Sequence, residues 1–199
     1  MKIARIIMGA AVMCAIVTAA SVGAQDRYGR DHYNRWSDRY NDNTYGSVST
    51  DEFVQRAAQG GMAEVAMSNL ARGRASDPDV RDFASQMVQD HSQANRQLHQ
   101  IAWRKGVSVP NDMDFSHRIA LRNMRNRRGD SFDRAYMRQM VEDHQNTLAM
   151  FRAYARNGDD PDLRAYAQQT LPALEHHRAM ARETQDAVMA GYGNRWRRD

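Results

Sequence analysis

The sequence carries the phrase Met-Val-x-Asp-His twice, as MVQDH over residues 87–91 and as MVEDH over residues 140–144. On a helix, a methionine four residues before a histidine lies one turn away on the same face. Imidazole nitrogen is a common ligand of transition metals, and methionine sulfur suits copper(I). The repeated phrase therefore makes His91 and His144 the first candidates for metal-binding chemistry.

Four predicted helices each carry one strongly polar residue on a face that is otherwise apolar or small. These residues follow the steps of three and four that mark the inward face of a helix in a bundle. Each lies about 13 to 16 residues from the predicted start of its helix, so the depths agree within roughly 5 Å at 1.5 Å per residue. We therefore expect one carboxylate and three imidazoles to meet near the middle of the fold: Glu64, His91, His144 and His177.

Two interpretations of this cluster stay open. In the first, Glu64, His91, His144 and His177 bind one transition metal ion, since three imidazoles and a carboxylate suit zinc, copper, iron or manganese. In the second, no metal is present and Glu64 accepts hydrogen bonds from the imidazoles. A buried carboxylate needs such partners, and three imidazoles would provide them.

Side chains next to the two histidines extend the candidate set. Asp90 and Asp143 each directly precede a histidine and are candidates to orient an imidazole from a neighbouring helix. Met87 and Met140 are alternative soft ligands for copper(I), although methionine at helical spacing is also ordinary core filling.

The remaining histidines are expected outside the cluster. His176 is rotated by about 100° from His177 on a helix, so only one of the two faces inward and His176 is expected at the rim. His99 and His117 are expected at the surface. No Ser/His/Asp order, phosphate-binding loop or paired-acid pattern positions a nucleophile, so no catalytic residue is predicted.

Capping signals define the helices that carry these residues. Ser49 and Glu52 form a capping box, and the pairs Asp77-Pro78 and Asp160-Pro161 each place an N-cap acid before a proline in the first turn. Gly106 is a stop signal. The predicted helices run near 50–75, 78–105, 114–127, 130–156 and 161–190.

The fold class predicted from these elements is all-α. No stretch alternates with a period of two residues, which excludes a sheet built from half-buried strands. The connections at 76–77 and 157–160 are short, so the helices that they join are expected to be antiparallel. Residues 49–190 are predicted to form one domain of four long helices, with one extra short helix between the second and the third.

The first 24 residues have the pattern of a cleavable export signal. Lys2 and Arg5 precede an apolar run over residues 6–20, and small residues lead up to Ala24 and Gln25, where cleavage is expected. The apolar run is short for a membrane span. We therefore predict a periplasmic or secreted protein whose mature chain has no transmembrane segment.

The composition of the mature chain excludes several classes of site. The only cysteine of the full sequence, Cys14, lies in the predicted export signal. The mature chain then has no cysteine, so neither a disulfide nor a thiolate metal site is expected. The formal charge of +4 falls to +2 when Lys2 and Arg5 are removed. The remaining arginines are interspersed with acidic residues, and this mixed surface disfavours nucleic-acid binding.

The flanks of the domain are polar. Residues 25–48 contain scattered tyrosine and arginine but few aliphatic side chains, so we predict a disordered leader there and a flexible tail over residues 191–199. The leader is a candidate contact for a protein partner in the cell envelope. The oligomeric state does not follow from these patterns.

Several strings resemble an exported bacterial family, domain of unknown function 4142. They are FVQRAAQGGMAEV, FASQMVQDHSQANRQL, FDRAYMRQMVEDHQ and LPALEHHRAMA, and the resemblance covers about residues 50–186. It implies a ferritin-like four-helix fold and export, and no particular activity. The phrase DRAYMRQMVEDHQNTLAMF also resembles a related exported family with MxxHH-type helices, often linked to copper. In this sequence Asp143 stands where that motif has its first histidine.

The sequence departs from the ferritin-like enzymes at one motif. Their di-iron centres use Glu-x-x-His on two helices. Val88 and Val141 stand three residues before His91 and His144, where that motif needs glutamate. A di-iron oxidase is therefore disfavoured. Two functions remain: a metal-binding protein of the cell envelope, and a structural or interaction module with a metal-free His/Glu core.

Overall fold

The computed structural model describes residues 48–195, with side chains to residue 191. Its helices are α2 (Thr50–Arg74), α3 (Pro78–Lys105), α4 (Phe115–Arg125), α5 (Gly129–Asn157) and α6 (Pro161–Arg195). No strand occurs within this range, so the predicted all-α class is confirmed. The predicted export signal (1–24), all but the last residue of the predicted leader (25–48) and the end of the predicted tail lie outside the described residues.

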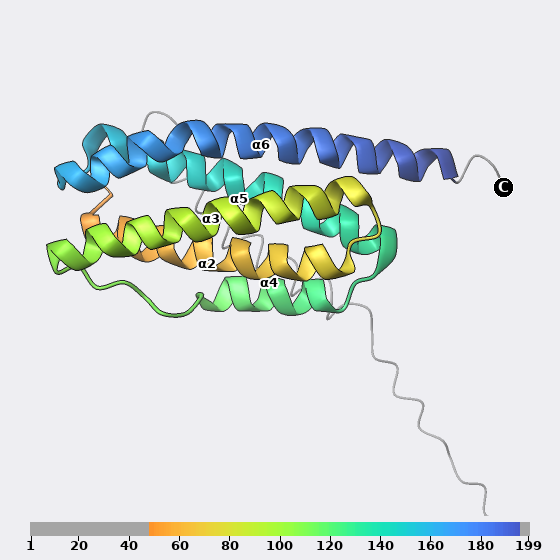
Figure 1. Ribbon diagram of the computed structural model, residues 1–199, viewed down its shortest axis with the longest axis horizontal. Helices are drawn as coiled ribbons and strands as arrows, with labels where there is room; N and C mark the ends of the chain where they lie inside the picture. The colour runs from red at the N-terminus through yellow and green to blue at the C-terminus, as the bar shows by residue number, and fades with distance from the viewer. Residues whose placement is uncertain (1–47, 196–199) are drawn as a thin grey trace, which may run out of the picture.

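The four long helices lie side by side, and each runs antiparallel to the helices next to it (Figure 1). Helix α2 packs on α3 and on α5, and α6 packs on α5 and on α3, so that α3 and α5 face each other diagonally. The short helix α4 lies along α2 and touches α5. Within residues 48–195, no helix combines the length and apolarity that crossing a membrane requires.

The helix starts follow the predicted capping signals. The Ser49 side chain accepts from the Glu52 backbone N–H at 3.2 Å, and Asp77 accepts from Asp79 N–H at 2.9 Å. Asp160 caps α6 in the same way. Helix α3 ends at Gly106, whose φ of 68° is the left-handed conformation that glycine adopts without steric cost.

The end of α6 differs from the prediction. The helix continues through residue 191, the predicted start of the tail, and ends at Arg195. Gly191 lies inside the helix and has no positive φ. A single glycine within a helix costs only about 1 kcal/mol relative to alanine, so it weakens the helix without ending it.

The core consists of two clusters of buried side chains, one toward each end of the helices. The first contains Phe53 stacked on Tyr154, with ring centroids 4.0 Å apart, and also contains Val48, the last residue of the predicted leader. The second is rich in methionine and includes Met87 and Met140. The predicted polar cluster falls near the boundary between these two apolar regions.

A candidate metal centre of three histidines

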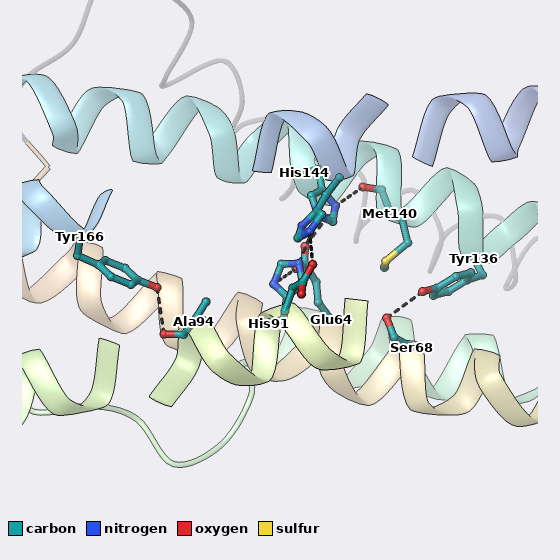
Figure 2. Close-up of polar contacts among 10 residues, drawn as sticks. Glu64, Ser68, His91, Ala94, Tyr136, Met140, His144 and Tyr166 are labelled. Carbon is teal, nitrogen blue, oxygen red and sulfur yellow. Dashed lines mark hydrogen bonds and ion pairs between the residues drawn. The ribbon is translucent and has the colours of Figure 1, made fainter. Parts of the chain in front are cut away.

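Glu64, His91, His144 and His177 come together from the four long helices, and all four are buried. The centroids of the three imidazole rings are 5.2 to 5.4 Å apart in every pair. One nitrogen of each ring lies within 4.8 Å of those of the other two. Figure 2 shows the side chains of Glu64, His91 and His144 directed toward one another at this point.

Oxygen acceptors hold one nitrogen of His91 and one of His144. Nδ1 of His91 lies 2.6 Å from Oε2 of Glu64, and Nδ1 of His144 lies 2.9 Å from the carbonyl oxygen of Met140. Met140 is four residues before His144, so the helix itself places this carbonyl beside the ring. Glu64 also approaches His144, with Oε1 at 3.6 Å from its Nδ1.

These contacts decide which nitrogens carry hydrogen. A carboxylate and a carbonyl oxygen only accept hydrogen bonds, so Nδ1 is the protonated nitrogen in both rings. The two Nε2 atoms then present lone pairs, and they lie only 3.3 Å apart. Two facing lone pairs at this distance repel each other unless a proton or another cation lies between them.

The imidazole of His177 also bonds to an oxygen acceptor, but through Nε2, whereas His91 and His144 use Nδ1. Nε2 of His177 lies 2.8 Å from Oδ2 of Asp90, which belongs to the neighbouring helix α3 and also accepts from Gln86 at 2.7 Å. Nε2 is therefore the nitrogen that carries hydrogen. Nδ1 of His177 is buried and has no hydrogen-bond partner within the described part of the chain.

Burial and the attraction between opposite charges have opposite effects on the pKa values of Glu64 and His91. Burial works against ionisation of Glu64, but attraction from His91 and His144 and the hydrogen bond from His91 together lower the pKa of Glu64 to about 2. Burial also disfavours a charged His91, yet attraction from Glu64 prevails and raises its pKa. Without a metal, Glu64 and His91 therefore form a buried ion pair.

The other two imidazoles are neutral. Burial and repulsion from His91 lower the pKa of His177 to about 4, although the hydrogen bond to Asp90 acts in the other direction. Burial is also the largest cause of the lowered pKa of His144. A neutral imidazole is the form that binds a metal ion, so these two rings are ready to act as ligands.

The other predicted site residues lie around this centre. Met87 and Met140 are fully buried in the methionine-rich cluster, and Figure 2 places Met140 between His144 and Tyr136. Asp143 is buried as well, and its Oδ1 accepts from the Gln139 side chain at 3.0 Å.

His176 is exposed, as expected, and its ring centroid lies 6.5 Å from that of His177. His99 is exposed too. The prediction for His117 was wrong, because only 12% of its side chain is exposed and its Nδ1 lies 2.7 Å from Oδ2 of Asp114. The spacing of these two residues, three apart at the start of a helix, was the signal for this pair.

The model of the family described as Domain of unknown function (DUF4142) matches residues 38–184. The chain belongs to this family. The resemblance noted in the sequence is thereby confirmed, and the family description names no activity. No curated protein matches this DUF4142 chain.

Three solved structures share the fold of this DUF4142 chain. CopM in the Cu(II)-bound form has a TM-score of 0.61 at 16% identity, over 71% of this chain and 99% of that one. A DUF305 fragment from Deinococcus radiodurans has a TM-score of 0.60 at 17% identity, over 70% of this chain and 95% of the fragment. A putative secreted DUF305 protein from Streptomyces coelicolor has a TM-score of 0.57 at 15% identity, over 70% and 94%. At these identities the likeness shows a common fold.

The three imidazoles fit the donor set of a metal ion. In each ring one nitrogen bonds to an oxygen, which is how histidine ligands are usually oriented in metal sites. Of the second nitrogens, those of His91 and His144 face each other and that of His177 is buried without a partner in the described residues. Two nitrogens on one tetrahedral ion at about 2.0–2.1 Å are roughly 3.3–3.4 Å apart, and the Nε2 atoms of His91 and His144 already have this spacing. One nitrogen of His177 lies within 4.8 Å of a nitrogen of each of the other two rings.

Proposed function

We propose that the protein binds one transition metal ion through Nε2 of His91, Nε2 of His144 and Nδ1 of His177. The observation that carries the proposal is the orientation of the rings. All three have one nitrogen on an oxygen acceptor, the second nitrogens of His91 and His144 face each other, and the rings lie close enough to share one ion. The orphaned Nδ1 of His177 is the strongest single element, because a buried polar atom without a partner is costly.

In this proposal Glu64 and Asp90 orient the ligands. Both carboxylates lie on the outer nitrogen of an imidazole, where they raise its basicity and fix its hydrogen. Three protein ligands leave one coordination position for water or a small molecule, which is the arrangement of a catalytic or transfer site more than of a closed structural site.

Copper is the first metal to test. Three imidazole nitrogens suit copper(II) and zinc, and also accept iron(II) or manganese(II). The similarity in fold to the Cu(II)-bound form of CopM favours copper among these. The buried sulfurs of Met87 and Met140 lie in the adjoining core and are the soft donors that copper(I) prefers.

We also propose that the fold is a ferritin-like four-helix bundle and that the protein works in the periplasm or outside the cell. The antiparallel arrangement of the long helices supports the first point. The second rests on the basic start, apolar run and small residues of the first 24 positions. Sequencing the amino terminus of the exported protein tests it, and a mature chain that begins at Gln25 is the expected result.

The second candidate function is a structural or interaction module with no metal. One observation favours it: a charged His91 donates from Nδ1 to Glu64 and from Nε2 to His144, which satisfies three members of the cluster with a single proton. This arrangement leaves Nδ1 of His177 without a partner, so it accounts for less of the geometry than a metal ion does.

Copper(II) and zinc titrations of the mature protein, purified without a histidine tag, test the proposal. We expect one ion per chain for the wild type and a loss of binding for His91→Ala. His176→Ala is the matched control, because His176 is an exposed histidine beside the site. Equal metal content in wild type and His91→Ala would overturn the proposal. A wild type that takes up neither metal would favour the interaction module.

A further inference from the structure

A route to the three imidazoles follows from two neighbouring cavities. The outer one is a cleft of about 400 Å³ between α2, α4 and α5. Its lining mixes apolar surface with neutral polar side chains, among them Gln55, Gln59, Asn146 and Thr147. Amide and hydroxyl groups of this kind accommodate a hydrated ion, and the volume is ample for one with its first shell of water.

Each basic group that lines the cleft has a carboxylate partner. Arg56 lies 2.8 Å from Glu52, and His117 lies 2.7 Å from Asp114. The cleft therefore presents no isolated positive charge that would repel a metal cation.

The inner cavity has a volume of about 70 Å³ and reaches the candidate site directly. Its lining includes Glu64, His91 and His177, together with Asp90. This volume is less than one fifth of that of the cleft, and imidazole rings line it. An ion that enters it can exchange water for imidazole nitrogen.

The two cavities share three lining residues, Arg56, Gly60 and Thr147. Gly60 lies one helical turn before Glu64, and Thr147 lies three residues after His144, so both stand next to the site on its own helices. A Cβ atom added at Gly60 would meet no atom within 4 Å. The boundary between the cleft and the site thus lacks a side chain at the point where α2 could supply one.

We propose that the cleft between α2, α4 and α5 is the entrance through which a metal ion reaches the three imidazoles, with Gly60 as its opening. This inference rests on the proposed metal-binding function. It assigns a role to a glycine that otherwise weakens the middle of a long helix. A side chain at this position closes the route without touching any of the three ligands.

The test compares the rates of copper(II) uptake and release in three forms of the mature protein: wild type, Gly60→Leu and Gly73→Leu. Gly73 is the matched control, since it also lies in α2, also has open space where a Cβ atom would lie, and lines neither cavity. We expect Gly60→Leu to slow both rates by about tenfold or more with little change in affinity, and Gly73→Leu to behave as wild type. Thr147→Leu, which narrows the same point from α5, is expected to act in the same direction.

Three outcomes would overturn the inference while leaving the metal site intact. Uptake by Gly60→Leu and Thr147→Leu at the wild-type rate would show that the ion enters elsewhere. Equal slowing in Gly73→Leu would show an effect of helix stability alone. Slowing by Ala173→Leu in place of Gly60→Leu would move the entrance to α6, because Ala173 lines the inner cavity and not the cleft. A wild type that binds no metal would refute the proposed function itself.

Discussion

Nε2 of His91 and Nε2 of His144 lie 3.3 Å apart, although their helices α3 and α5 are diagonal partners in the fold. Both histidines end a Met-Val-x-Asp-His phrase, and each ring is held on its Nδ1 side by an oxygen. The two histidines of the repeated phrase thus come into contact across the centre of the bundle, between helices that do not pack side by side. Since neither ring can donate to the other while both are neutral, this contact requires a cation, either a proton or a metal ion.

The contact between Asp90 and His177 gives the first prediction. Asp90→Asn keeps the size of the side chain but removes the charge that fixes hydrogen on Nε2 of His177. Loss of such an outer carboxylate weakens metal binding by about 10- to 100-fold, and we expect a loss of that size for copper(II) or zinc in a competition titration.

Asp82→Asn is the control for this change, because Asp82 is an exposed aspartate on the same helix. Wild-type affinity in both variants would mean that Asp90 does not support a ligand. Equal weakening in both would point to the lost charge on α3 in general.

The hydrogen bond between Ser68 and Tyr136 gives a second prediction, on stability. Both residues are fully buried and their hydroxyl oxygens lie 2.8 Å apart (Figure 2). Ser68→Ala leaves the Tyr136 hydroxyl unsatisfied and is expected to lower the free energy of unfolding by about 1–3 kcal/mol. Tyr136→Phe should cost less, because the Ser68 hydroxyl can turn to the carbonyl one turn earlier in α2.

Urea denaturation of the single and double variants measures this coupling. The double variant is expected to be more stable than Ser68→Ala, since it leaves no buried tyrosine hydroxyl behind. Strictly additive losses would show that the hydrogen bond contributes nothing beyond the two side chains.

The helices and the position of the polar cluster could be predicted because both depend on local chemistry. Asp77 and Asp160 mark helix starts through hydrogen bonds to residues two positions further along the chain. The inward placement of His91 and His144 depends only on helical periodicity and on the apolar side chains around them. Because the polar residues lie at similar distances from the starts of helices of similar length, they come to the same height along the bundle axis.

The orientation of the imidazoles could not be predicted from the same patterns. That Glu64 lies on Nδ1 of His91, and Asp90 on Nε2 of His177, depends on side-chain torsions and on the packing angles between helices. These are tertiary quantities with no signal in the spacing of residues. His117 was placed wrongly for a related reason, because its own helix α4 packs on α2 and α5, and this tertiary contact has no signal in the spacing of residues.

A third prediction concerns Gly61, which faces α3 where Gly60 faces the cleft. A Cβ atom at Gly61 would lie 2.0 Å from Oδ1 and 2.8 Å from Cγ of Asn95. Gly61→Ala therefore forces the Asn95 side chain to turn away, and this cost is expected to offset part or all of the about 0.5–1 kcal/mol gained in helix propensity.

The gain in stability should appear in full when Asn95 is shortened. In an Asn95→Ala background the clash is gone, and Gly61→Ala is expected to stabilise by about 0.5–1 kcal/mol. Gly73→Ala, at an open position of the same helix, should stabilise in both backgrounds. Thermal or urea unfolding measures all of these, and a Gly61→Ala that stabilises equally with and without Asn95 would contradict the contact between Gly61 and Asn95.

The buried ion pair between Glu64 and His91 gives a prediction for acid stability in the absence of metal. The pKa of Glu64 falls from 4.5 to about 2 in the folded protein, through attraction from the histidines that outweighs burial. A carboxyl whose pKa is lowered by folding stabilises the folded state above its unfolded pKa, and this contribution is lost as the pH falls through the folded value. The stability due to Glu64 is therefore expected in full above pH 4.5 and to decline between pH 4.5 and about 2.

Glu64→Gln removes this contribution and keeps the shape of the side chain. With a chelator present, the variant should be less stable than wild type above pH 4.5, and the two unfolding curves should converge as the pH falls below it. Glu142→Gln, an exposed change on α5, should show no such convergence. A difference between wild type and Glu64→Gln that stays constant down to pH 2 would mean that the carboxylate is not held by charge.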